Sequence, residues 1–484
     1  MQPLELVSEL SAFLPTESVL YEGEDLRPYE CDGLSAYRQT PMIVVLPQTE
    51  DEVIKILQIC HRTKTPVVPR GAGTGLSGGA LPHESGILLS LAKLKRILEL
   101  DPASRTARVQ PGVRNLAISE AAAPYGLYYA PDPSSQIACS IGGNVAENSG
   151  GVHCLKYGLT VHNILELRVI TLSGEILEIG GSGLDASGYD LLALMTGSEG
   201  MLGIVTEIVV KLIPSAEKAQ VVMAAFDDIR EAGNAVANVI GAGIIPAGME
   251  MMDRITTRAV EEYVHAGYNL EAAAILLCES DGTVEEVADE VLRIGEIMRQ
   301  SGAIEIKTSR DESERLRFWA GRKAAFPAAG RVSPDYYCMD GTIPRKSLAF
   351  VLTGIERLSS EYGLRCMNVF HAGDGNLHPL ILYDANQPGE LQKTEEFGAK
   401  ILEMCIDVGG TITGEHGVGI EKINQMCSQF TRHELEMFHS VKAAFDPSGL
   451  LNPGKAIPTL RRCAEHGAMH VHRGEEKFPD LPRF

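Results

Sequence analysis

Residues 66–80 have the sequence PVVPRGAGTGLSGGA, and five of the nine residues that follow Arg70 are glycine. Glycine has no Cβ and tolerates positive φ, so such a run can wrap its N–H groups around an anion, most often a phosphate. A flexible surface loop is the alternative, but a linker of that kind would carry more polar residues and would not follow an apolar strand. We interpret the stretch as a strand followed by an anion-binding loop.

The spacing Gly73-x-Gly75-x-x-Gly78 also matches the Rossmann dinucleotide fingerprint literally. That fingerprint requires a helix to begin within the motif. Here Leu81-Pro82 interrupts the chain, and residues 86–91, GILLSL, are typical of a second strand. No Lys-Ser or Lys-Thr pair follows the glycines, as a Walker loop would require. The stretch therefore predicts two strands joined by a loop that holds a pyrophosphate through backbone contacts.

The composition predicts a large globular protein. The 484 residues are 44% hydrophobic, enough for two or three domains, and the net charge of −21 disfavours nonspecific binding to nucleic acid or to anionic membranes. The N-terminus lacks the basic and apolar regions of a signal peptide, and we expect no integral membrane segment. Ten cysteines without a CxxC pair predict neither a disulfide framework nor an iron–sulfur cluster, so we expect most of them to be reduced and buried.

Local patterns predict a mixture of helices and strands. Thr49 and Glu52 form a capping box that predicts a helix to about Thr63, after an apolar strand at 42–47. After Pro214 the glycine loops give way to helices that alternate with strands, which places a domain boundary near Pro214. The other elements that we expect are strands at 107–110, 208–212 and 274–278 and helices at 115–123, 284–299 and 312–324.

Two further regions are rich in small residues. Residues 131–151 are long and poor in bulky side chains, and residues 197–207 form another glycine-rich turn before a strand. A segment of this composition fits beside a large flat ligand, although an irregular loop with a purely structural role is the alternative. Together with the first loop, these regions predict one extended cofactor site.

A pair of histidines in the second half predicts a metal site. Asp374-Gly375 is a type I′ hairpin signal, and pairing about that turn would place His371 directly opposite His378, with their Cβ atoms about 5 Å apart. Glu415 offers a third ligand, and in an extended segment His416 would point to the other side and could act as a base. Two unrelated surface histidines remain the alternative for the pair. A second, weaker metal site is conceivable in the tail, at Cys463, His466, His470 and His472.

Taken together, these motifs resemble those of FAD-linked oxidases of the vanillyl-alcohol-oxidase type. The match covers nearly the whole chain, and the motifs occur in the same order. Within that family the chain is similar to the FAD subunits of bacterial glycolate oxidases, including YECDGLSAY at 29–37 and the tail at 462–472. The other stretches that carry the resemblance are RGAGTGLSGG at 70–79, residues 131–151, GSEG at 197–200, residues 371–378, GEHG at 414–417 and NPGK at 452–455.

The resemblance implies an α+β fold. It implies a two-part FAD-binding domain at 1–213, a larger α+β substrate cap domain with the metal-like site at 214–440, and a C-terminal segment at 441–484 that returns to the FAD domain. FAD would be noncovalent, because the glycine loop lacks the histidine to which some relatives attach it. The residues that would bind FAD are Arg70, Gly71, Gly73, Thr74, Gly75, Ser77, Gly78, Pro131, Ser134, Gly142, Gly143, Asn144, Asn148, Gly200, Ile204 and Asn452.

The resemblance also implies roles in catalysis. In relatives that oxidise D-2-hydroxy acids, the residues that match His371, His378 and Glu415 bind a divalent metal, zinc or a similar ion. The residue that matches His416 is the base, and the one that matches Arg322 in FWAGR (318–322) holds the carboxylate; by itself, Arg322 could equally be a solvated helix arginine. Relatives that act on 2-hydroxyglutarate have a lysine where this chain has Cys338, a difference that favours a short acid such as glycolate or D-lactate.

The chemistry of these groups suits the oxidation of a 2-hydroxy acid. Such a substrate needs a cation for its carboxylate, a Lewis acid and a base for its hydroxyl, and a hydride acceptor. The resemblance further implies iron–sulfur and second flavin-type partner subunits in a glycolate oxidase complex. The protein would then be cytoplasmic, with peripheral attachment to the inner membrane through its partners as an option. A D-2-hydroxyglutarate-type dehydrogenase, a metal hydrolase and an inactive flavoprotein that serves assembly are the alternatives.

Overall fold

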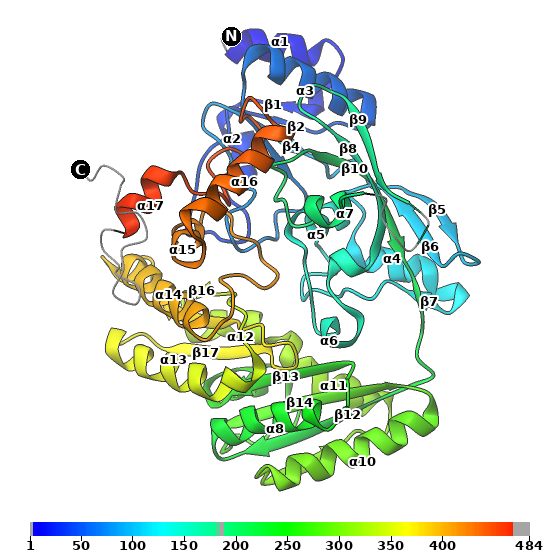
Figure 1. The fold of residues 1–484 in the computed structure, drawn as a ribbon, viewed down its shortest axis with the longest axis vertical. Coiled ribbons are helices and arrows are strands. Elements are labelled where there is room, and N and C mark those ends of the chain that lie inside the picture. Colours follow the sequence, from blue (N-terminus) through cyan, green and yellow to red (C-terminus); the bar gives the residue numbers. More distant parts are fainter. Residues whose placement is uncertain (1–2, 182, 184–187, 468–484) are drawn as a thin grey trace. The chain divides into compact units, whose positions relative to one another are not determined.

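The computed structural model describes residues 3–181, 183 and 188–467, and the chain divides into two compact units (Figure 1). Unit 1 contains Met1–Gly150, Leu159–Pro214 and His416–Phe484, and unit 2 contains Gly151–Gly158 and Ser215–Glu415. Unit 2 is the smaller of the two, so the expectation of a larger cap domain was wrong. The chain returns to unit 1 at His416, well before residue 441, because the N–H groups of Val418 and Gly419 donate to the Glu199 carboxylate of unit 1.

Unit 1 contains two main sheets. The first has the order β1-β2-β4-β3, with β2 and β3 parallel to β4, and the second has the order β5-β6-β10-β8-β9 and is antiparallel. The strands are β1 (Val19–Leu20), β2 (Ile43–Val45), β3 (Val67–Arg70), β4 (Ile87–Ser90), β5 (Ile97–Asp101), β6 (Thr106–Val109), β7 (Leu127–Tyr128), β8 (Ile164–Ile170), β9 (Ile176–Gly180), β10 (Ile204–Lys211) and β11 (Ile213–Pro214). The α-helices are α1 (Pro3–Ser11), α2 (Gly23–Leu26), α3 (Glu50–Thr63), α4 (Asn115–Ala122), α5 (Ile141–Glu147), α7 (Leu191–Met195), α15 (Ile423–Gln429), α16 (Arg432–Phe445) and α17 (Leu460–Gly467).

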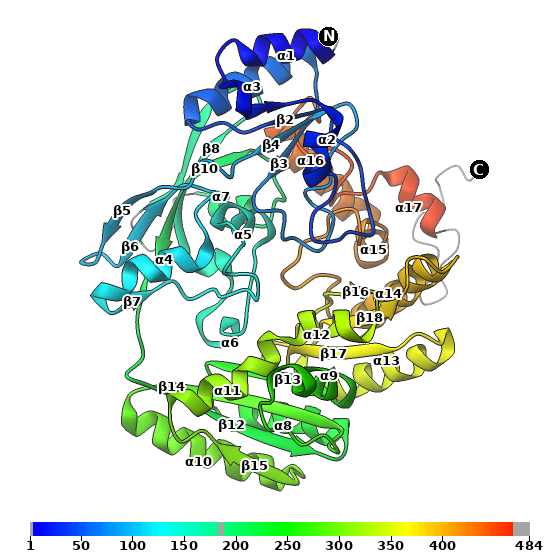
Figure 2. The same cartoon turned by 180° about the vertical axis from the view of Figure 1, so that it is seen from behind.

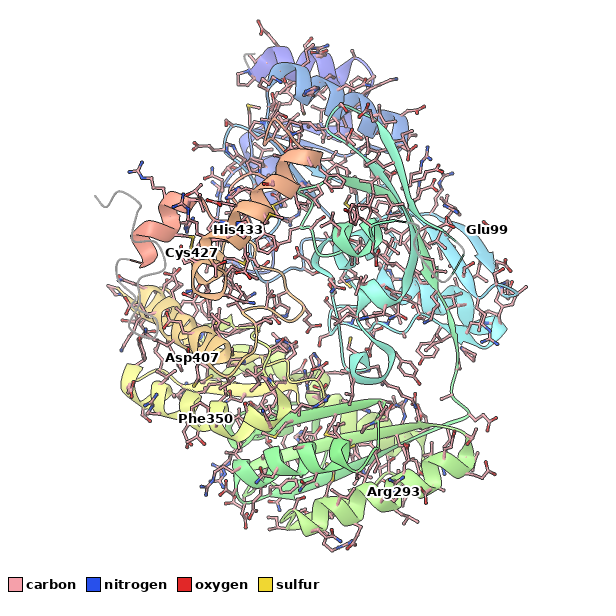
Figure 3. All side chains as sticks on the ribbon, in the orientation of Figure 1. Glu99, Arg293, Phe350, Asp407, Cys427 and His433 are labelled. Atoms are coloured by element: carbon pink, nitrogen blue, oxygen red, sulfur yellow. A yellow bond between two sulfur atoms is a disulfide. The ribbon has the colours of Figure 1, made fainter. Side chains whose placement is uncertain are left out.

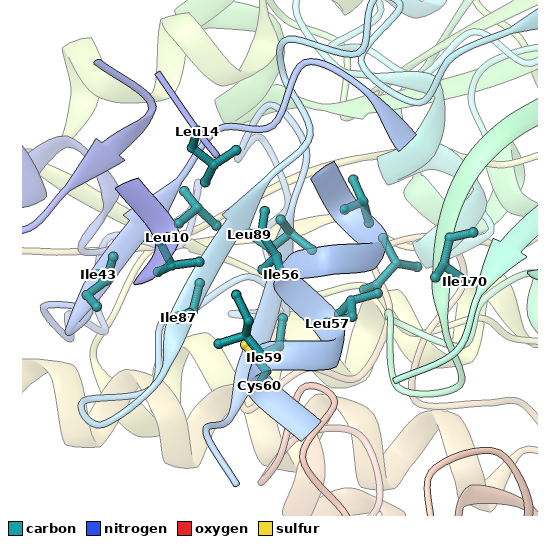
Figure 4. Close-up of a cluster of buried hydrophobic side chains, with 14 of the residues drawn as sticks. Leu10, Leu14, Ile43, Ile56, Leu57, Ile59, Cys60, Ile87, Leu89 and Ile170 are labelled. Atoms are coloured by element: carbon teal, nitrogen blue, oxygen red, sulfur yellow. The ribbon is translucent and has the colours of Figure 1, made fainter. Parts of the chain in front are cut away.

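Helix α3 follows the sequence signal closely. Thr49 caps its N-terminus and Glu52 completes the predicted capping box. Its apolar face, which includes Ile56, Leu57 and Cys60, is fully buried against β2 and β4 (Figure 4). Amphipathic spacing therefore predicted both the helix and the face that it buries. The strands and the helix predicted at 107–110, 208–212 and 115–123 are confirmed as β6, β10 and α4.

Unit 2 is built on a seven-stranded antiparallel sheet with the order β15-β12-β14-β13-β17-β18-β16. Helices α8, α10 and α13 cover one face of the sheet, and α9, α11 and α12 cover the other (Figures 1 and 2). The strands are β12 (Lys218–Phe226), β13 (Gly248–Asp253), β14 (Ala274–Gly282), β15 (Glu305–Thr308), β16 (Asp335–Cys338), β17 (Cys366–His371) and β18 (Pro379–Tyr383). The α-helices are α6 (Cys154–Tyr157), α8 (Ile229–Gly241), α9 (Arg254–Val264), α10 (Val284–Gln300), α11 (Glu312–Lys323), α12 (Ala325–Val332), α13 (Leu348–Tyr362) and α14 (Glu390–Asp407).

The histidine hairpin forms, but with a register that differs from the prediction. Asn368 of β17 pairs with Pro379 of β18, and His371 lies opposite Asn376 rather than opposite His378. The loop is two residues longer than a type I′ turn, and of its Asp-Gly pair only Gly375 has a positive φ. A shift of two residues preserves the alternation of faces, so the two histidines still share one face as diagonal neighbours.

One pair of cysteines forms a disulfide, whereas the other eight are free thiols, in line with the expectation that most of them are reduced. Cys427 of α15, labelled in Figure 3, is bonded to Cys463 of α17. The bond removes Cys463 from the alternative metal site in the tail. His470 and His472 of that alternative lie outside the described residues, as does the side chain of His466.

Candidate active site

Three candidate metal ligands converge at the end of the β17–β18 hairpin in unit 2. The Nε2 atoms of His371 and His378 lie 3.2 and 2.9 Å from Oε1 of Glu415. The two imidazole rings are 5.1 Å apart between centroids and nearly perpendicular. The donor atoms of all three residues lie within 4.8 Å of one another, so one small ion could replace the hydrogen bonds between them.

The charges of these groups are strongly coupled. Burial lowers the pKa of His371, but the nearby Glu250 and Glu415 outweigh it and hold this pKa well above its usual value. Burial likewise raises the pKa of Glu415, but the hydrogen bonds from His371 and His378 outweigh it and hold this pKa well below its usual value. These interactions favour a Glu415 carboxylate beside a His371 imidazolium, and a divalent cation could take the place of the proton in this donor set.

Asp340 fixes the segment that presents Glu415. Its fully buried carboxylate accepts hydrogen bonds from Thr413 Oγ1 at 2.6 Å and from the backbone N–H groups of Gly414 and Glu415 at 3.1 and 3.2 Å. It also accepts one from Asn376 Nδ2, in the hairpin, at 2.9 Å. One carboxylate therefore joins the Glu415 segment to the loop between the two histidines. The sequence analysis missed this residue.

Arg322 lies on the buried side of α11, and its guanidinium is paired with Glu250. Nε of Arg322 donates to Oε2 of Glu250 at 2.5 Å, and Nδ1 of His371 lies 2.5 Å from Oε1 of the same carboxylate. Arg322 is 1% exposed, and its Nη2 has no hydrogen-bond partner among the described residues. A buried donor without a partner costs free energy, which a bound anion would recover.

His416 follows Glu415 directly in the chain and is the first residue of the C-terminal segment of unit 1. Its role as a base remains a prediction. Glu250 was missed by the sequence analysis, although there was a signal for it: it is a carboxylate between two methionines in the buried strand β13.

In unit 1, the glycine loop connects the parallel strands β3 and β4 without a helix, as predicted. None of the N–H groups from Gly71 to Gly79 donates a hydrogen bond to another described residue. The side-chain oxygen of Ser77 is buried and has no partner within the described part of the chain. A loop with so many unsatisfied donors fits an anion such as a pyrophosphate.

The other predicted FAD residues lie around this loop. A Cβ at Gly71 would lie 2.3 Å from Ser140 Oγ, the N-cap of α5, and a Cβ at Gly200 would lie 2.3 Å from Pro69. Nδ2 of Asn452 donates to the carbonyl oxygen of Gly79 at 3.0 Å. The structure therefore brings the three small-residue regions and the NPGK motif together within unit 1.

Several of these residues have structural partners of their own. Asn144 accepts a hydrogen bond from Asn115, whose Nδ2 also donates to the carbonyl of Pro131. Asn148 is the left-handed C-cap of α5, a helix that the sequence analysis did not predict because its first turn contains two glycines. Of the remaining predicted residues, Gly142 and Gly143 lie in α5, Ser134 is exposed before that helix, and Ile204 is buried at the start of β10. In the glycine loop, Gly73 and Gly78 have positive φ, and Thr74 and Gly75 are partly buried. Arg70 donates a hydrogen bond to the carbonyl oxygen of Cys31.

A buried lysine beside Asn452 was also missed. Nζ of Lys455 donates to Asn452 Oδ1 at 2.7 Å, and burial lowers the pKa of this lysine to about 8 despite the opposing charges of Glu199, Asp32 and Glu147. Burial raises the pKa of Glu199, against the hydrogen bonds from the 418–419 backbone. Both residues lie in motifs that carry the resemblance, GSEG at 197–200 and NPGK at 452–455, but the charges that act on Lys455 come from distant parts of the sequence.

Comparison with known proteins agrees with this architecture. Residues 41–180 match the family described as FAD binding domain, and residues 215–456 match the family described as FAD linked oxidases, C-terminal domain. Over 475 residues the chain is 63% identical to the glycolate oxidase subunit GlcD of Escherichia coli K12, covering 98% of this chain and 95% of that protein. It is 30% identical to a D-lactate dehydrogenase of Anaerostipes hadrus, covering 93% and 97% of the two chains. Among solved structures, p-cresol methylhydroxylase with substrate bound has the same fold, with a TM-score of 0.78 at 18% identity over 95% of this chain and 97% of that one.

The two matched domains and the shared fold define a flavin-dependent oxidoreductase. The chain belongs to the FAD-linked oxidase family, as the resemblance predicted. The α+β fold class and the vanillyl-alcohol-oxidase-type architecture are confirmed. Within the described part of the chain, none of the helices combines the length and the apolar composition that crossing a bilayer requires.

Proposed function

We propose that this protein oxidises a short 2-hydroxy acid to the corresponding 2-oxo acid, with glycolate as the preferred candidate and D-lactate as the second. The observation that carries the proposal is the cluster in unit 2, where three metal-type ligands and a buried arginine with an unsatisfied donor are joined through Glu250. Similarity to a glycolate oxidase subunit at 63% identity supports glycolate, and the D-lactate dehydrogenase relative supports the second candidate.

The residues present fit both implied groups. His371, His378 and Glu415 would hold a divalent metal such as zinc, and the glycine loop and the residues around it would hold FAD noncovalently. When bound, the metal supplies a Lewis acid and FAD supplies a hydride acceptor. Arg322 would bind and orient the substrate carboxylate through its unpartnered Nη2.

His416 is proposed as the base that removes the proton from the substrate hydroxyl. Its position directly after Glu415, within the bend at 414–416, would keep it near the hydroxyl of a substrate bound beside that ligand. Replacing His416 by Ala should lower turnover about 100-fold or more while FAD remains bound. Near-normal turnover in this variant would exclude His416 as the base.

Partner subunits are part of the proposal. The similar protein of E. coli is named a subunit, and this chain has no CxxC pair of its own to begin an electron-transfer chain. We infer an assembly with iron–sulfur and second flavin-type subunits. The location proposed with it is the cytoplasm, with peripheral attachment to the inner membrane through those subunits.

The deciding experiment is anaerobic reduction of the bound flavin with a panel of 2-hydroxy acids, with and without a chelator. We expect glycolate or D-lactate to bleach the flavin absorbance, and we expect the chelator to slow the reaction strongly. Faster bleaching by D-2-hydroxyglutarate would favour the dicarboxylate alternative. Protein purified without flavin that hydrolyses esters or amides in a metal-dependent way would favour the hydrolase.

A further inference from the structure

Glu250 joins the two halves of the candidate site. It lies in β13, directly opposite His371 of β17 in the antiparallel register, so the two side chains share one face of the sheet. One carboxylate oxygen lies 2.5 Å from His371 Nδ1, and the other accepts from Arg322 Nε at 2.5 Å. The carboxylate is almost completely buried, so water cannot substitute for either contact.

The contact with His371 determines which ring nitrogen faces the ligand set. An ionised carboxylate only accepts hydrogen bonds, so Nδ1 of His371 must carry the proton. In the neutral ring this leaves the lone pair on Nε2, the atom that lies 3.2 Å from Glu415 Oε1. Carboxylates of this kind orient metal-binding histidines and increase their basicity.

The contact with Glu250 also fixes the orientation of the Arg322 guanidinium. Because Nε is bonded to Glu250, the guanidinium plane cannot rotate about its stem, and Nη2 remains as a buried donor without a partner in the described residues. A planar guanidinium held on one edge presents its other edge to a carboxylate. Glu250 thus sets the position of both groups relative to each other.

We propose that Glu250 is the positioning residue of this site, holding His371 in the tautomer that binds metal and Arg322 in the orientation that binds the substrate carboxylate. The proposal rests on the function proposed above and extends it to a residue that touches neither metal nor substrate.

The matched variants are Glu250→Gln and Arg322→Lys. In E250Q the amide oxygen should turn toward Arg322, which has only donors, and the NH2 group should then face His371 Nδ1. That arrangement favours the tautomer with the proton on Nε2, which cannot bind metal. We expect zinc affinity to fall 10- to 100-fold, as measured by titration calorimetry against a competing chelator, and we expect KM for the hydroxy acid to rise. R322K should raise KM at unchanged zinc affinity.

The double variant E250Q/R322M guards against misfolding, since it removes the arginine that E250Q leaves imperfectly paired in the core. It should retain FAD and still show the 10- to 100-fold loss of zinc affinity. The proposal would be overturned if E250Q and the double variant both bound zinc as tightly as the wild type while His371→Ala lost zinc binding. That result would leave the metal site itself supported. If the wild-type chain bound no zinc, the metal site itself would be overturned. If, in addition, E250Q had the same KM for the hydroxy acid as the wild type, the proposed orientation of Arg322 by Glu250 would be overturned as well.

Discussion

Replacing Asp340 by Asn should destabilise unit 2 and weaken the candidate metal site together. The Asp340 carboxylate is fully buried and accepts from Asn376, Thr413 and the backbone of Gly414 and Glu415. Asparagine has almost the same size, but it replaces one acceptor oxygen with a donor, which must then face at least one of these donors.

The expected cost follows from these contacts. A hydrogen bond to a charged group contributes about 1.5–3 kcal/mol, and an unsatisfied buried donor costs about 1–3 kcal/mol. Losing one such bond and weakening the others should lower the free energy of unfolding of unit 2 by roughly 3 kcal/mol. Because the Glu415 segment loses its anchor, zinc affinity should fall about tenfold or more.

The assay can be confined to unit 2, because the chain has a single tryptophan, Trp319 of α11, and it is buried there. Urea unfolding followed by its fluorescence reports the stability of this unit. The matched control is Thr413→Val, which removes only one of the donors and should cost about 1.5 kcal/mol, the lower end of the range for a bond to a charged group. An Asp340→Asn protein within about 1 kcal/mol of the wild type, with unchanged zinc affinity, would refute the anchoring role.

Three further outcomes follow from buried and strained positions. Burial acts to raise the pKa of Glu279, but its hydrogen bonds and the neighbouring charges lower this pKa to about 2. The ionised side chain therefore stabilises the folded state above about pH 4.5, and this stabilisation is lost as pH falls toward 2. Between about pH 4.5 and 2, the free energy of unfolding of the wild type should therefore fall by roughly 3 kcal/mol more than that of Glu279→Gln, as measured by tryptophan fluorescence. Parallel curves of unfolding free energy against pH for the two proteins would contradict this. Gly375→Ala should destabilise the hairpin by more than about 2 kcal/mol in urea, because φ is +86° and a Cβ would lie 2.1 Å from the carbonyl oxygen of Ile343. Gly78→Ala, at φ +74° with a Cβ 2.6 Å from Cγ1 of Ile420, should strain the loop and weaken FAD binding about tenfold in a fluorescence titration.

Much of the fold could be predicted because its signals are local. The capping box at Thr49 and the apolar spacing after it act within one helix, and the structure confirms both. The hairpin was predicted from Asp374-Gly375 with the wrong loop length, yet the two histidines still share a face. Alternation along a strand has a period of two, so an error of two residues in register changes which residues are opposite but not which side they occupy.

The residues that the sequence analysis missed are those whose partners lie far away in the chain. Glu250 contacts Arg322 and His371, which are 72 and 121 positions away, and Asp340 contacts residues up to 75 positions away. A carboxylate in a buried strand is costly unless it is paired, so each such residue implies a partner even though the sequence does not say which. Once the sheet order places β13 beside β17, the register sets His371 opposite Glu250, and the proposed metal ligand and the proposed substrate-binding arginine share one carboxylate. Motifs could thus predict which candidate ligands lie together, whereas their alignment depends on the packing of strands that are distant in sequence.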